Sequence, residues 1–163
     1  MKRAFTLIEM LISITILSIM MIFLYESYSS LNISNNILKK EVTSLKKYQI
    51  KKKVFFLDFV NIIENKITIL DKADKNDVVF LQSSNSIHKR INPYIAYFVN
   101  DSKLYRLESI KEFVKYPIGF DHEFSAECFG DVESFKVYKS TKEKTSYLLH
   151  VKFKNSENIL LRL

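Results

Sequence analysis

The pattern of apolar and polar positions divides the chain into three stretches. Residues Phe5 to Tyr25 are apolar almost without interruption and hold one charged side chain, Glu9. From Glu26 to about Lys66, apolar residues recur mostly at three-, four- or seven-residue spacing, which predicts an amphipathic helix. Beyond it, short β-branched and aromatic runs separated by polar turns predict an antiparallel sheet. The expected fold class is therefore α+β, with a long amino-terminal helix packed on a β-sheet domain.

The first apolar stretch is long enough to cross a membrane. No glycine or proline occurs before Pro93, so the first two stretches can join in one helix of roughly 60 residues. The 21 residues from Phe5 to Tyr25 span about 31 Å as a helix, close to the thickness of a bilayer's hydrocarbon core. Lys2 and Arg3 precede the span and predict an amino terminus on the cytoplasmic side.

Seven short runs are predicted as strands. Asn100, Asp101 and Ser102 are turn formers that predict a hairpin between two of them. For Ser109 to Pro117 a helical turn and an irregular loop both fit the sequence. The predicted strands are Val78–Leu81, Tyr94–Val99, Leu104–Leu107, Phe124–Phe129, Phe135–Tyr138, Tyr147–Phe153 and Ile159–Leu163.

Composition excludes several functional classes. The chain has two glycines, Gly119 and Gly130, so neither a P-loop nor a GxGxxG dinucleotide site can be built. The single cysteine, Cys128, excludes an intramolecular disulfide and a thiolate metal cluster, and we expect it to be a small half-buried side chain. The three histidines form no metal-binding spacing, and no nucleophile–base pair stands out. We therefore expect no metal, no cofactor and no enzymatic activity.

Glu9 needs an explanation, because a carboxylate in a membrane span is unfavourable by a few kcal/mol and is by default functional. Ala4, a small residue, lies between the basic pair and Phe5. A cut after Ala4 would leave the apolar segment on the mature protein, with its new amino group on Phe5, one helical turn from Glu9. A neighbouring copy could then place its Phe5 ammonium against this Glu9. The alternative is that Glu9 reaches back to the lipid headgroups.

The run KRA-FTLIEMLISITIL resembles the class III signal of type IV pilins and of the pseudopilins of type II secretion and DNA-uptake machines. The resemblance implies cleavage between Ala4 and Phe5 by a prepilin peptidase, N-methylation of Phe5, and Glu9 as the carboxylate that docks subunits in a filament. Ala4 stands where the family usually has glycine. No glycine lies in the span, so helix contacts of the GxxxG kind are unavailable.

The resemblance also implies an organisation and a place in the cell. Residues 1–4 would be the leader, 5–25 the transmembrane helix half, 26–66 the amphipathic helix half and 67–163 an extracytoplasmic β-rich domain. The protein would be a single-pass inner-membrane protein that enters a filament as a minor pilin or pseudopilin and primes or caps assembly. Its partners would be other pilins or pseudopilins, the prepilin peptidase, the inner-membrane assembly platform and the lipid bilayer. Secretion, pilus and DNA-uptake machines share this chemistry.

The region after the helix has a more diffuse resemblance. The order of VVFLQ and the PYIAYFVNDSKLYRL hairpin is similar to that of the J-type minor pseudopilin and the related W-type minor pilin. The positions that match are Asp58, Tyr97, Leu104 and Arg106.

Basic and aromatic side chains leave further interpretations open. The net charge is +7, and the chain has 13 Phe and 9 Tyr. We expect the aromatic residues to form the core, with base stacking as the alternative. A lysine run is expected to be a solvated helix face, with anionic headgroups, acidic filament neighbours or DNA as possible contacts. An alternative function is a single-pass membrane-anchored extracytoplasmic binding protein, with DNA binding in competence as one form. The run contains Lys39, Lys40, Lys46, Lys47, Lys51, Lys52 and Lys53.

Overall fold

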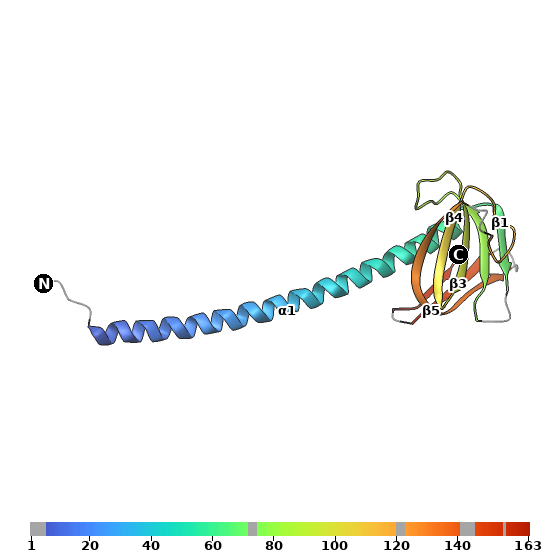
Figure 1. Cartoon of the computed structure of the whole chain (residues 1–163). Helices are drawn as coiled ribbons and strands as arrows, with labels where there is room; N and C mark the ends of the chain where they lie inside the picture. Colours follow the sequence, from blue (N-terminus) through green and yellow to red (C-terminus); the bar gives the residue numbers. More distant parts are fainter. Residues whose placement is uncertain (1–5, 72–74, 120–122, 141–145, 155) are drawn as a thin grey trace. The chain divides into compact units, whose positions relative to one another are not determined.

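The computed structural model describes residues 6–71, 75–119, 123–140, 146–154 and 156–163. It consists of a single long helix followed by seven strands, as Figure 1 shows along the chain. The chain forms two compact units, Met1–Lys46 and Lys47–Leu163. The first unit holds most of the helix, and the second holds the last turns of the helix and the whole sheet, so the expected α+β fold is confirmed.

Helix α1 runs over Leu7–Val60. The helix is continuous because its sequence contains no glycine or proline, the residues that most often interrupt a helix. Our prediction that the helix continues to about Lys66 is wrong, because Ile62–Leu70 forms strand β1. This segment is rich in β-branched isoleucine and threonine, which favour strands, and its pairing with β2 satisfies the backbone. Glu64, with φ of 53°, lies where the register of the pairing shifts.

The strands form one antiparallel sheet in the order of the sequence, β1 to β7. The Tyr94–Leu107 hairpin is confirmed, and both of its central turn residues, Asp101 and Ser102, have positive φ as a tight hairpin turn requires. The predicted strands Phe124–Phe129 and Phe135–Tyr138 belong to a single strand, β5, which continues through residues 130–134. The strands after β1 are β2 Val78–Ser83, β3 Tyr94–Asn100, β4 Lys103–Ser109, β5 Phe124–Ser140, β6 Ser146–Phe153 and β7 Ile159–Arg162.

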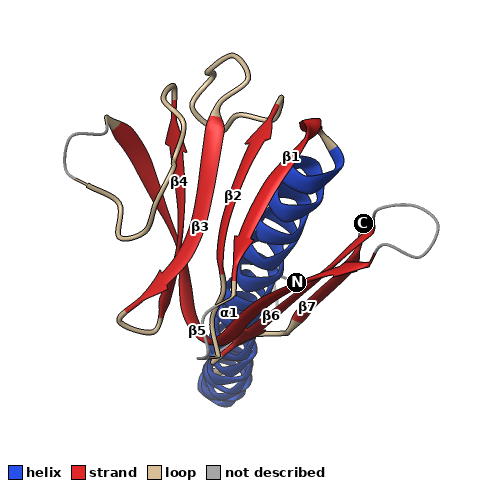
Figure 2. Cartoon of the chain, turned by 90° about the vertical axis from the view of Figure 1, so that its right-hand side faces the viewer, coloured by secondary structure: helices blue, strands red, loops and turns tan. Residues whose placement is uncertain are grey.

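Strand β5 curls the sheet around the end of α1. Its first half pairs with β4 and its second half with β6. Between the halves, Gly130 has a φ of 105°, a conformation that side chains disfavour. The backbone N–H of Asp77, just before β2, donates to the carbonyl of Phe135 in β5 at 2.8 Å. Figure 2 shows the last turns of α1 lying between the two halves of the sheet.

Two apolar cores lie on the two faces of the sheet. On the α1 side, Phe55 and Phe59 pack against strand residues such as Tyr97, Phe135 and Leu149. On the other face, an irregular segment after β4 packs onto the sheet and forms a smaller cluster. That cluster consists of Val78, Phe80, Ala96, Leu107 and Phe113. Of the segment Ser109–Pro117, Ser109 ends β4 and the remainder is an irregular loop with one buried aromatic side chain, Phe113.

Candidate functional site

The beginning of α1 is built around Glu9. The backbone N–H and the hydroxyl of Thr6 both donate to Oε2 of Glu9 at 2.9 Å. The backbone N–H of Glu9 donates back to Oγ1 of Thr6 at 3.4 Å. This reciprocal arrangement is a capping box, in which side chains satisfy amides that the first helical turn leaves unpaired. Glu9 therefore helps to begin the helix, a role beyond the docking role expected from the sequence.

Glu9 keeps one oxygen available for a partner. In the part of the chain that the structure describes, Oε1 of Glu9 accepts no hydrogen bond. A carboxylate has about four acceptor positions, so Glu9 can retain the Thr6 cap and accept an ammonium from another molecule. The other predicted residues of this site, Lys2, Arg3, Ala4 and Phe5, lie outside the described residues.

The helix around Glu9 presents an apolar surface. Its large apolar side chains from Leu7 to Leu24 are exposed, and an 18-residue window has a mean hydropathy of 2.5. By length and composition α1 is able to cross a membrane. The hydroxyls of Ser13, Thr15 and Ser18 donate to helix carbonyls at 2.8 Å, which satisfies them without water. Glu9 is the one charged side chain between Leu7 and Tyr25.

The predicted lysine run is divided between the two compact units. Lys39, Lys40 and Lys46 are exposed residues of the first unit, and Lys47, Lys52 and Lys53 are exposed residues of the second. Their amines are accessible to anionic partners.

Lys51 differs from the rest of the run. It is half-buried, and its ammonium lies 4.8 Å from the centroid of the Phe153 ring, a cation–π contact. Burial lowers the pKa of Lys51 below its ordinary value. The structure thus gives Lys51 a packing role and leaves six lysines of the run exposed.

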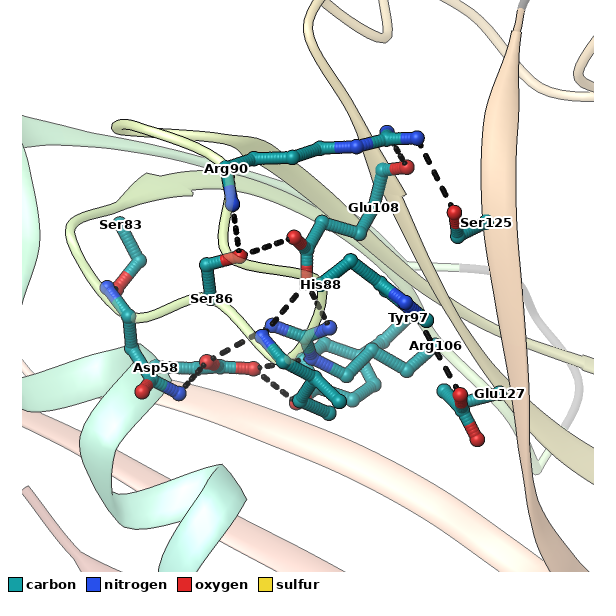
Figure 3. A network of polar contacts seen from close by, with 12 residues as sticks. Asp58, Ser83, Ser86, His88, Arg90, Tyr97, Arg106, Glu108, Ser125 and Glu127 are labelled. Carbon is teal, nitrogen blue, oxygen red and sulfur yellow. Dashed lines mark hydrogen bonds and ion pairs between the residues drawn. The ribbon is translucent and has the colours of Figure 1, made fainter.

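A buried ionic cluster joins the end of α1 to the sheet (Figure 3). Asp58 and Arg106 are both fully buried. The guanidinium of Arg106 donates to both carboxylate oxygens of Asp58, at 2.7 and 3.2 Å. The hydroxyl of Tyr97 donates to Asp58 at 2.5 Å, and the amide of Asn85 donates to it at 2.6 Å. One helix carboxylate thereby holds strands β3 and β4 and the loop after β2.

Glu108 extends the cluster to the surface loop between β2 and β3. It accepts a hydrogen bond from Arg106 at 2.8 Å, from the hydroxyl of Ser86 at 2.5 Å and from the N–H of Ile87 at 3.0 Å. Burial disfavours its charge, but these three donors outweigh burial and hold the pKa of Glu108 below its ordinary value. Burial, followed by the charge of Asp58, raises the pKa of Tyr97 well above its ordinary value.

The cluster explains the positions that match the minor-subunit hairpin. Asp58, Tyr97 and Arg106 contact one another, and Leu104 is fully buried in the adjacent core. Glu108 and Asn85 were not predicted to belong to it. The available signal was that Leu104, Arg106 and Glu108 alternate along one strand, which places the two charges on the core face. The charged groups of the cluster, Asp58, Arg106 and Glu108, are fully buried, and they position the end of α1 on the sheet.

Some aromatic residues of the sheet domain line a surface groove. A groove of about 340 Å³ on the outer face of β3, β4 and β5 has an uncharged lining, which does not suit a phosphate backbone. Its lining includes Phe98, Asn100, Tyr105, Tyr116, Pro117 and Phe124.

Cys128 is exposed on β5, so the expected half-buried position is wrong. The side chain of Cys128 is exposed, whereas that of the next residue, Phe129, is buried. Among the described residues, no group of three His, Cys, Asp or Glu side chains is arranged to hold a metal ion.

Comparison with known proteins identifies the amino terminus. Residues 1–25 match the family model of the prokaryotic N-terminal methylation motif. No curated protein and no solved structure matches the chain. The matched region contains the predicted cleavage position and Glu9, and it ends within the apolar part of α1. The matched motif is of the pilin-like kind, and together with the apolar helix it supports a membrane anchor at the amino terminus.

Proposed function

We propose that this protein is a minor pilin or pseudopilin, a subunit that primes or caps assembly of a type IV pilus-like filament. The observation that carries the proposal is Glu9. It is the one charged residue of the exposed apolar stretch from Leu7 to Tyr25, it lies within an N-terminal methylation motif, and among the described residues its Oε1 accepts no hydrogen bond. The sheet domain supports the minor role, because three of the four positions that match the J-type and W-type subunits, Asp58, Tyr97 and Arg106, meet in one cluster.

The proposed path begins in the inner membrane, with the amino terminus cytoplasmic and the sheet domain outside. Prepilin peptidase removes residues 1–4 and methylates the amine of Phe5. The apolar half of α1 remains in the bilayer, and Glu9 accepts the Phe5 ammonium of a neighbouring pilin at the assembly platform. The paired charges then leave the lipid together, which avoids an isolated charge in an apolar environment. The domain division is 1–4, 5–25, a second helix half that ends at Val60, and the sheet domain.

Processing is tested by mass. The full chain is expressed with and without a prepilin peptidase, and the intact mass is measured. We expect loss of the tetrapeptide MKRA and the gain of a methyl group on Phe5. An unchanged mass would favour the alternative of a plain membrane anchor with an extracytoplasmic binding domain.

Docking is tested with Glu9→Ala and a matched control, Glu26→Ala, which removes an acidic residue of the same helix outside the apolar span. We expect both variants to insert and to be cleaved, but only Glu9→Ala to be lost from sheared filaments in a quantitative immunoblot. Equal incorporation of the two variants would refute the docking role of Glu9.

A further inference from the structure

Among the described residues, no strand pairs with the outer side of strand β7. It is the last strand in the sheet order and pairs with β6. Tyr147 and Leu163 exchange both backbone hydrogen bonds at 2.8 Å. Since such pairs alternate in an antiparallel ladder, Leu161 also faces β6, whereas the N–H and C=O of Leu160 and Arg162 face away. Within the described residues, these outward groups have no hydrogen-bond partner.

An apolar groove lies between this edge and α1. The groove has a volume of about 260 Å³ and is lined by Gln49, Lys52, Lys53, Phe56 and Leu161. We call it the β7 groove. Phe56 is 45% exposed although it neighbours the buried Phe55 on the helix. An exposed aromatic side chain beside a free strand edge is typical of a surface that binds another chain.

The β7 groove is positively charged. Lys52 and Lys53 are its two charged side chains, and both are exposed. Lys51 is not part of it, since its ammonium lies over Phe153. A strand placed beside β7 would direct alternate side chains toward Phe56 and the two lysines. Apolar and acidic side chains on that face would therefore match the groove.

We propose that the open edge of β7 receives an extended, acidic and apolar segment of a neighbouring filament subunit, which adds to the sheet as an eighth strand. Its backbone pairs with Leu160 and Arg162, an apolar side chain covers Phe56, and a carboxylate pairs with Lys52 or Lys53. This mode of recognition takes affinity from backbone hydrogen bonds and specificity from the alternate side chains. The proposal rests on the proposed function only for the source of the segment.

The probe is a fluorescein-labelled nonapeptide, Val-Thr-Glu-Thr-Val-Thr-Glu-Thr-Val with acetylated and amidated ends, which as a strand places its valine and glutamate side chains on one face. The full chain is held in nanodiscs of neutral phosphatidylcholine, and binding is followed by fluorescence anisotropy. We expect saturable binding that is about tenfold weaker in the double variant Lys52→Glu/Lys53→Glu. Lys39→Glu/Lys40→Glu, a matched charge reversal on the same helix outside the groove, should bind like the unchanged protein. A peptide with lysine in place of glutamate should not bind.

A second pair of variants separates strand addition from attraction to the lysines. Leu160→Pro removes an outward N–H and leaves the ladder to β6 intact, because proline is tolerated at the free side of an edge strand. We expect about tenfold weaker binding for Leu160→Pro and a change within about twofold for Leu160→Ala. Hydrogen exchange at Leu149 and Leu161 checks that β6 and β7 remain paired. If Leu160→Pro disturbs that pairing, the slowed exchange of the Leu160 and Arg162 amides on peptide binding supplies the same test.

Three results would overturn the proposal. They are no saturable binding of the glutamate–valine peptide, equal affinity for Leu160→Pro and Leu160→Ala with the ladder intact, and unchanged exchange of the Leu160 and Arg162 amides. Each of these leaves cleavage after Ala4 and the docking role of Glu9 untouched, so failure here is distinguishable from failure of the proposed function.

Discussion

Two of the four carboxylates of helix α1 are in opposite situations. Glu9, in the first turn, is exposed in apolar surroundings and has Thr6 as its partner. Asp58, in the last turn, is fully buried and receives hydrogen bonds from Arg106, Tyr97 and Asn85. The satisfied carboxylate stabilises the position of the helix on the sheet, whereas the carboxylate with a remaining acceptor is free to recognise a neighbour. If Glu9 docks subunits as proposed, saturation of hydrogen bonds, rather than charge itself, distinguishes the structural carboxylate from the docking one.

The largest effect is expected from Arg106→Met. It leaves Asp58 and Glu108 as buried charges without their cation, and removal of one partner of a buried pair destabilises by about 3–5 kcal/mol. The measurement is denaturant unfolding of the sheet domain within the full chain, followed by near-ultraviolet circular dichroism. Arg162→Met, an exposed arginine on β7, is the control and should change the free energy of unfolding little. Similar values for the two variants would show that the buried cluster does not hold the helix end.

Tyr97→Phe tests a single hydrogen bond of the same cluster. The substitution keeps the ring among Phe55 and Phe135 and removes the donor to Asp58. A hydrogen bond to a charged group contributes about 1.5–3 kcal/mol, so we expect a smaller loss than for Arg106→Met. The free energy of unfolding is measured in the same way. Tyr105→Phe on the outer face of the sheet is the control, and an equal loss there would remove the special role of Tyr97.

The fold could be predicted from the sequence more fully than the buried cluster. The single long helix, the hairpin with Asn100, Asp101 and Ser102, and the strands of the second half follow from patterns within a few residues. The end of the helix was missed because the spacing of Ile62, Ile63 and Ile67 suits a helix as well as a strand. The contacts of Asp58 depend on the register between α1, β3 and β4, which local patterns do not contain. Glu9 was found because a lone carboxylate in an apolar span is visible in the sequence itself.

Acid should weaken the sheet domain through Glu108. Its folded-state pKa is below the ordinary value of 4.5, so the folded state binds fewer protons than the unfolded state near that pH. The stability from the charged form is complete above pH 4.5 and is lost as pH falls through the folded pKa. We expect Glu108→Gln to flatten the fall in the free energy of unfolding below pH 4.5. Glu133→Gln, which removes the exposed pair with Lys152, should leave the fall nearly unchanged.

The smallest effect is expected from Thr6→Ala, which removes the side-chain partner of Glu9. Loss of an N-cap side chain weakens a helix by about 1 kcal/mol, and here the loss is confined to the first turn, far in sequence from the sheet. Hydrogen exchange of the amides of residues 7–10 should quicken while the unfolding of the sheet domain stays unchanged. Because Glu9 keeps its charge in this variant, filament incorporation should persist. If Thr6→Ala abolished incorporation as completely as Glu9→Ala, the capped helix start, and not the free acceptor oxygen of Glu9, would be what the neighbouring subunit recognises.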